Sequence, residues 1–202
     1  MWRQLFSLER DHVWRQLAAV LKADFKRTGF WQLPVVRVPH RNWAIVLDSW
    51  KRNTFTKRTG VYCIRVRSQF LNRDGFWFTI YPQGVVSTAR KWFGLQDVAV
   101  GHERFDSEFI IQGNDAAKLQ ALFDNPRIRF ALESRPHLHF SIADSEHSYW
   151  GVPEGIGELC LVSDEDILDL AGLKLLCELF AATLDELCRI NTISIDDPLV
   201  RF

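Results

Sequence analysis

The chain has 202 residues, of which 47% are hydrophobic and 25% charged, and its formal net charge is zero. This length fits one domain, and the hydrophobic content excludes an intrinsically disordered chain. The first residues alternate polar and apolar types, and no apolar run approaches the roughly 20 residues of a membrane-spanning helix, so we expect neither a signal sequence nor a transmembrane segment.

The zero net charge hides an asymmetry between the two halves of the chain. Residues 1–100 carry a net charge of +11, whereas residues 101–202 carry −11. Such a split is typical of a nucleic-acid or membrane face, but it equally indicates two halves that attract each other within one fold. A homodimer built on the opposite charges is a further hypothesis.

The four cysteines indicate a reducing compartment. They lie far apart, with neither a Cys-x-x-Cys pair nor a zinc-binding spacing, at Cys63, Cys160, Cys177 and Cys188. Each lies in an apolar stretch, where a free cysteine behaves as a small hydrophobic residue. We therefore expect a soluble, cytoplasmic protein.

The first half is predicted to contain one helix followed by strands. Apolar residues recur at three- and four-residue spacing over residues 2–27, which predicts an amphipathic helix that Gly29 ends. A short extended segment is predicted at Val35–Val38, and strands are predicted at Trp43–Trp50, Gly60–Arg67 and Phe76–Tyr81. A turn at residues 72–75 joins the last two, so we expect them to pair as a hairpin with Trp77 on the same outer face as Arg65 and Arg67.

The second half is predicted to mix both kinds of element. Glu108–Gln112 is a predicted strand, and two short helices follow, over Ala116–Phe123 after an Asn114-Asp115 cap and from Pro126 to Leu132. Three further strands are predicted, at His137–Ile142, Ser148–Val152 and Glu158–Val162. Ser163 or Asp164 is expected to cap a final helix over about residues 165–189, which has a wide apolar stripe.

Together these elements predict an α+β fold. Strands outnumber helices and follow one another without helical crossovers, which indicates an antiparallel β-sheet system with the N-terminal helix and the long C-terminal helix packed on it. We expect a single domain over residues 1–202. The alternative is two similar α/β-layer halves, closely packed, at about residues 1–92 and 93–202, because a helix followed by strands occurs in each.

The histidines offer the most metal-like pattern in the chain. His137 and His139 are two residues apart on a predicted strand, so their imidazoles point the same way, and His147 adjoins the next one. The alternative is that both lie on the solvent-facing side of an amphipathic strand whose Leu138 and Phe140 are buried.

Four carboxylates and one histidine gather in the segment Gln96–Glu108. Asp97 and Asp106, together with His137 and His139, would supply a metal-dependent enzyme or a metal-binding protein. Carboxylates beside glycine in a turn more often accept hydrogen bonds from backbone amides. No Walker loop, dinucleotide fingerprint or nucleophile elbow occurs, so the sequence favours a protein that is not an enzyme, and it predicts no cofactor.

Basic and aromatic residues form the preferred binding surface. The residues that would contribute are Lys51, Arg52, Phe55, Lys57 and Arg58 at a predicted hairpin tip, and Arg65, Arg67 and Trp77 on the outer sheet face. Cations beside stacking rings suit single-stranded nucleic acid, an anionic membrane surface or an acidic protein surface. We therefore predict a binding module for an anionic partner, the alternative being a solvated hairpin whose arginine stems cover the sheet.

The chain resembles an uncharacterised bacterial protein family of unknown function. The resemblance rests on the segments Phe76–Tyr81, Gly94–Gly101, Phe105–Asp115 and Asn125–Arg129 and on the closing Leu-rich helix, over about residues 10–190. It implies a bacterial cytoplasmic domain and no catalytic residue. The basic hairpin tip departs from the pattern, because similar chains are merely polar there.

Overall fold

The computed structural model describes residues 2–27, 33–54, 57–83, 97–135, 137–143, 152–163, 169–196 and 198, with only the backbone for residues 2–9 and 50–62. Its strands form one eight-stranded sheet in the order β1-β2-β3-β4-β8-β7-β5-β6. The strands are β1 (Asp24–Lys26), β2 (Val35–His40), β3 (Trp43–Thr54), β4 (Lys57–Leu71), β5 (Phe78–Pro82), β6 (Phe109–Gly113), β7 (Leu138–Ala143) and β8 (Ile156–Ser163). Every neighbouring pair is antiparallel, as predicted.

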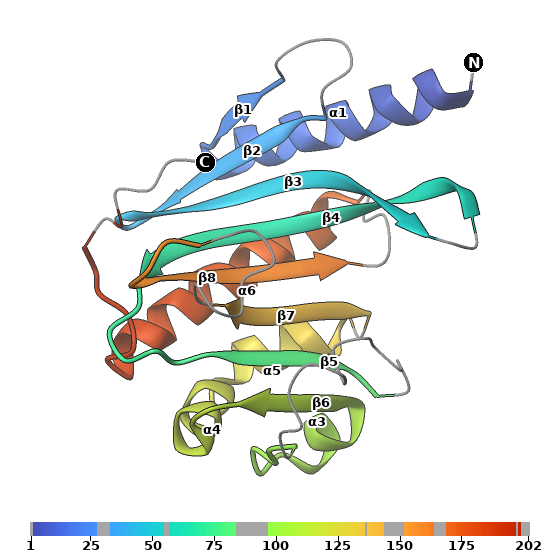
Figure 1. Ribbon diagram of the computed structural model, residues 1–202. Coiled ribbons are helices and arrows are strands. Elements are labelled where there is room, and N and C mark those ends of the chain that lie inside the picture. The colour runs from blue at the N-terminus through green and yellow to red at the C-terminus, as the bar shows by residue number, and fades with distance from the viewer. Residues whose placement is uncertain are drawn as a thin grey trace.

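The helices cover one face of this sheet. They are α1 (Trp2–Leu21), α3 (Glu103–Glu108), α4 (Ala116–Phe123), α5 (Pro126–Glu133) and α6 (Leu170–Arg189). Figure 1 shows α1 behind β2, α6 behind β4 and β8, and α5 behind β7. The predicted α+β class is therefore confirmed, including the N-terminal helix and the long C-terminal helix on the sheet.

A continuous apolar row explains why the helices pack on this face. Residues paired in register across seven strands are all almost fully buried, namely Val36, Leu47, Val66, Leu161, Phe140, Ile80 and Ile111. The buried stripe of α6 lies over them, and its Phe180 ring meets Phe140 at 5.7 Å between centroids. Because side chains alternate along a strand, the residues between these positions fall on the second face of the sheet.

The aromatic residues concentrate in this core. Phe78 lies between three other phenylalanine rings, those of Phe76, Phe123 and Phe140, with centroid distances of 5.9, 5.8 and 5.6 Å. All four side chains are buried. The high phenylalanine content of the sequence is thus used largely for packing between the sheet and the short helices.

The predicted hairpin between Gly60–Arg67 and Phe76–Tyr81 is wrong. Strand β4 pairs with β3 and β8, whereas β5 pairs with β7 and β6. After β4 the chain is held by the C-terminal segment instead, because Asn72 bridges to Ile193 and the Arg73 amide donates to the Thr192 carbonyl. β8 then occupies the edge of β4 that the predicted hairpin would have used.

Three element ends also differ from prediction. α1 ends at Leu21, well before Gly29, because Lys22 adopts a left-handed conformation (φ 51°) and Asp24–Lys26 turns back to pair with β2. α6 begins at Leu170 with Asp169 as its N-cap, whose carboxylate accepts from the Gly172 amide at 2.6 Å, so neither Ser163 nor Asp164 caps it. Gly29 and residues 144–151 lie outside the described residues, and Val152 is not in a strand.

Strands from both halves of the chain share the single sheet. β4 lies beside β8, and β5 lies between β7 and β6. Residues on either side of position 92 therefore build the same core, which places the two oppositely charged halves in direct contact.

Candidate functional site

The end of the β3–β4 hairpin projects beyond the other described strands. β3 pairs with β2 only up to Leu47, and β4 pairs with β8 only from Arg65 onward. Between these points the register runs from Ser49↔Ile64 to Arg52↔Val61 and, after an irregularity, to Thr54↔Lys57. Here the two strands pair with each other alone among the described strands. We call residues 49–54 and 57–64 the arm, and Figure 1 shows it extending beyond the other strands.

The arm carries a concentrated positive charge. Four of the predicted binding residues, Lys51, Arg52, Lys57 and Arg58, belong to it, and residues 49–64 contain no Asp or Glu. The predicted hairpin tip is confirmed by the pairing of Thr54 with Lys57, whereas Phe55 lies outside the described residues. A local charge of +4 on a chain of zero net charge creates a field that attracts anions.

Arg65 and Arg67 do not extend this positive surface, because both are bound to Asp48. Arg65 donates from Nε and Nη2 to the two carboxylate oxygens of Asp48 at 2.8 and 2.7 Å, and Arg67 Nη2 donates to Oδ2 at 2.9 Å. The three side chains are only 12–14% exposed. Burial would lower the pKa of Arg65, but the hydrogen bond and charge of Asp48 raise it above its ordinary value.

Sequence reasoning missed Asp48, although it had a signal. Asp48 is the one carboxylate within the apolar strand predicted at Trp43–Trp50, and the observed register places it directly opposite Arg65. A buried carboxylate requires a cationic partner, and the arginines of the neighbouring strand are the nearest choice.

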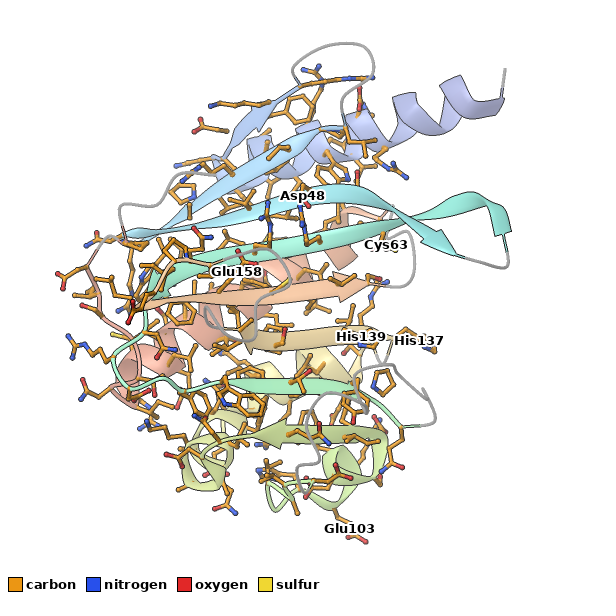
Figure 2. The ribbon with its side chains drawn as sticks, in the orientation of Figure 1. Asp48, Cys63, Glu103, His137, His139 and Glu158 are labelled. Atoms are coloured by element: carbon orange, nitrogen blue, oxygen red, sulfur yellow. The ribbon has the colours of Figure 1, made fainter. Side chains whose placement is uncertain are left out.

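A second carboxylate, Glu158 of β8, lies beside this cluster. Its side chain is 3% exposed, accepts a hydrogen bond from Gln69 Nε2 at 3.1 Å and lies 4.0 Å from Arg67 Nη1. Figure 2 shows Asp48 and Glu158 on neighbouring parts of the central sheet. Burial raises the pKa of Glu158, because the loss of hydration destabilises the carboxylate by more than the arginines and Gln69 stabilise it.

Cys160 lies on the same strand and is not suited to nucleophilic chemistry. Burial, together with the charge of Glu158, raises the pKa of its thiol to about 12. The thiolate is the nucleophilic form of cysteine, and a thiol with this pKa stays protonated at neutral pH. The cluster is a largely buried ion network that joins β3, β4 and β8.

The buried Glu158 gives the protein a defined pH dependence. The pKa of Glu158 is higher in the folded state than in the unfolded state, so the folded state binds the proton more tightly. The contribution of Glu158 to stability is therefore full below the ordinary glutamate pKa of about 4.3 and is lost as the pH rises through the raised pKa. Glu158→Gln removes this titration. We expect the stability of the variant relative to wild type to increase between pH 4 and pH 7 in urea unfolding; a constant difference across this range would contradict the assignment.

Trp77 is remote from the arginines of the predicted surface. It precedes β5, where its backbone amide donates to Asn114 Oδ1 at 3.0 Å, and its side chain is half-buried. Strands β8 and β7 lie between β5 and β4. The structure therefore does not bring Trp77 together with Arg65 and Arg67.

The predicted histidine pair lies at one end of β7. His137 is exposed just before the strand, and His139 is half-buried on the face opposite Leu138 and Phe140, as the amphipathic alternative predicted. His147 lies outside the described residues. Within the part of the chain that the structure describes, no group of three or more His, Cys, Asp or Glu is placed to hold a metal ion, so the metal site stays a prediction.

The carboxylates of the segment Gln96–Glu108 stabilise its turn. Asp106 accepts hydrogen bonds from the Val100, Gly101 and His102 amides at 2.9, 3.0 and 3.1 Å, and Asp97 accepts from Gln112 Nε2 at 3.0 Å. The role of Asp106 is the capping alternative considered above, whereas Asp97 binds a side-chain amide of β6. Figure 2 shows Glu103, at the start of α3, well separated from His137 and His139.

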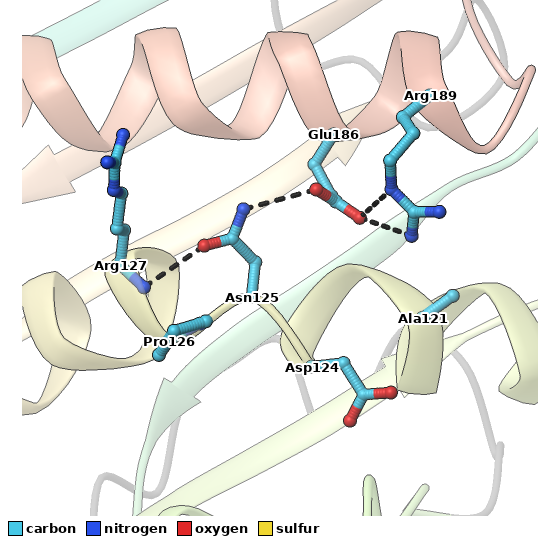
Figure 3. Close-up of a pocket in the computed structure, with 7 residues that line it drawn as sticks. All are labelled: Ala121, Asp124, Asn125, Pro126, Arg127, Glu186 and Arg189. Atoms are coloured by element: carbon cyan, nitrogen blue, oxygen red, sulfur yellow. Dashed lines mark hydrogen bonds and ion pairs between the residues drawn. The ribbon is translucent and has the colours of Figure 1, made fainter.

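A hollow of about 370 Å³ lies where α4, α5 and the end of α6 meet. Figure 3 shows the residues that line it, which are Ala121, Asp124, Asn125, Pro126, Arg127, Glu186 and Arg189. Asn125 donates to Glu186 Oε2 at 3.1 Å and accepts from the Arg127 amide at 3.0 Å, and Arg189 Nε donates to Glu186 Oε1 at 2.7 Å. These bonds cap α5 and join its start to α6, so Asn125, Glu186 and Arg189 already have structural roles.

Comparison with known proteins assigns no family. No protein-family model matches the chain, and no curated protein matches it. The crystal structure of the mycobacterial trehalose monomycolate transport factor A, TtfA, aligns with a TM-score of 0.45 and 9% identity over 94% of this chain and 98% of that chain. A likeness this remote supports no transfer of function, and the resemblance to an uncharacterised bacterial family stays a prediction. None of the helices in the described ranges has the length and apolar character needed to cross a membrane.

Proposed function

We propose that the protein is a non-enzymatic binding module whose arm binds an anionic partner. The observation that carries the proposal is the arm itself: a two-stranded ribbon that extends past the sheet and combines four cations with no carboxylate. Long-range attraction to an anion needs a concentrated positive charge, and the arm provides it.

The proposed surface is smaller than the one predicted from sequence. Arg65 and Arg67 are hydrogen-bonded to Asp48 and only 12–14% exposed, and Trp77 lies beyond β8 and β7. The binding charge is therefore assigned to Lys51, Arg52, Lys57 and Arg58 alone.

Retention on immobilised heparin, a generic polyanion, tests this assignment. Replacing the four arm cations together (K51Q, R52Q, K57Q and R58Q) is expected to move elution to a markedly lower salt concentration, because binding to polyanions depends on the number of paired cations. The matched control removes four exposed cations elsewhere, at Lys22, Lys26, Arg127 and Lys174, with the same change in net charge. Equal elution of the two variants would refute the arm as the binding surface.

A further inference from the structure

The arm exposes a backbone edge as well as charge. Pairing of β2 with β3 ends at Val36↔Leu47, so the seven residues Asp48–Thr54 of β3 have no strand on their outer side within the described ranges. The register shifts between Arg52 and Thr54, so the regular part of this edge is Asp48–Arg52, about 17 Å long at about 3.4 Å per residue. In an antiparallel pair, alternate residues direct both their amide and their carbonyl to one side, so about half of these residues offer a free donor and acceptor.

The two ends of the main sheet do not offer such an edge. β6 is covered in part, because its Ile111 carbonyl accepts from the Val98 amide at 2.8 Å. β1 has three residues, with Asp24 and Lys26 exposed. Short or covered edge strands are the usual protection against unwanted pairing, and the β3 edge is the long exception in the described structure.

We propose that the anionic partner is an acidic, extended protein segment that pairs with Asp48–Thr54 as an additional β-strand. This inference rests on the proposed function and names its partner class. Strand addition supplies affinity through main-chain hydrogen bonds and leaves specificity to the side chains. The arm has four cations and no carboxylate, so an acidic strand is the one whose charge complements it.

Two other occupants fit this edge less well. A second copy of the chain would bring two arms of charge +4 side by side, and like charges on neighbouring strands are destabilising. A nucleic acid would be held by the cations but has no peptide edge, so it would leave the β3 edge unpaired.

The test uses a fluorescein-labelled, end-blocked peptide of four Glu-Thr repeats and measures its binding to the full chain by anisotropy. Two further versions of the peptide each carry methyl groups on four of their backbone amide nitrogens. Methylation of alternate residues blocks one edge of the peptide strand and leaves the other, whereas methylation of the four central residues blocks both. We expect the alternate version to bind within about threefold of the parent and the central version to bind at least about tenfold more weakly, because an amide without hydrogen cannot donate to the ladder.

Three outcomes would overturn the inference. Equal binding of the two methylated peptides would show that the partner is held by charge alone. Tighter binding of the oligonucleotide (dT)5, which has the same four charges as the peptide, would favour nucleic acid. Self-association through the arm, seen in sedimentation of wild type but not of the quadruple arm variant, would favour a second copy. In each case arm-dependent heparin retention would still stand, so failure of the strand model is distinguishable from failure of the proposed function.

Discussion

Replacing Asp48 with Ala is expected to lower the free energy of unfolding by about 3–5 kcal/mol. The substitution removes the carboxylate that accepts three hydrogen bonds from Arg65 and Arg67, and it leaves two guanidinium groups in a site where they are only 12–14% exposed. A buried cation that loses its carboxylate partner keeps its desolvation cost but loses the attraction that offset it. Urea unfolding at pH 7 measures the loss.

The control for Asp48→Ala is an ion pair at the surface. Lys174 and Glu178 of α6 lie 3.7 Å apart with side chains 48% and 62% exposed, and Lys174→Ala should cost less than about 0.5 kcal/mol. If both substitutions cost the same, the Asp48 network would not be the buried ion cluster described above.

Phe78→Ala is expected to cost about 3–5 kcal/mol. The Phe78 side chain is fully buried and its ring contacts those of Phe76, Phe123 and Phe140, so truncation leaves a cavity between β5, β7 and the short helices. The surrounding rings belong to different elements and cannot all move inward. Thermal or urea unfolding measures the change.

Phe130 of α5 supplies a matched comparison for Phe78. It is 64% exposed, so Phe130→Ala removes the same atoms from a site that is already in contact with water. We expect a cost below about 0.5 kcal/mol. Similar losses for the two variants would place the core elsewhere than at Phe78.

Strand identity was predictable because alternation of apolar and polar residues records which face of a strand is buried. β7 illustrates this, since Leu138, Phe140 and Ile142 are buried and His139 lies on the other face. Strand order was not predictable in the same way. The apolar face of β4 can pack beside several neighbours, and contacts at Asn72 and Arg73 with the C-terminal segment, over 100 residues away, select β8 instead of β5.

The predicted site failed where an outward-facing position was equated with a free charge. Alternation correctly separates Arg65 and Arg67 from the apolar Ile64 and Val66, but the second face of the sheet is itself largely buried at these positions. Only knowledge of the β3–β4 register reveals that Asp48 binds both arginines. The basic arm was predictable because a hairpin tip and its charges are both local in sequence.

The arm's role is tested most directly by amide hydrogen exchange of the full chain with and without a heparin oligosaccharide. A bound anion should slow exchange of backbone amides in residues 48–64, and exchange in β5 and β6 should not change. Protection confined to those residues is the expected result. Unchanged exchange in the arm, with protection at the hollow around Asn125 and Glu186 instead, would contradict the account.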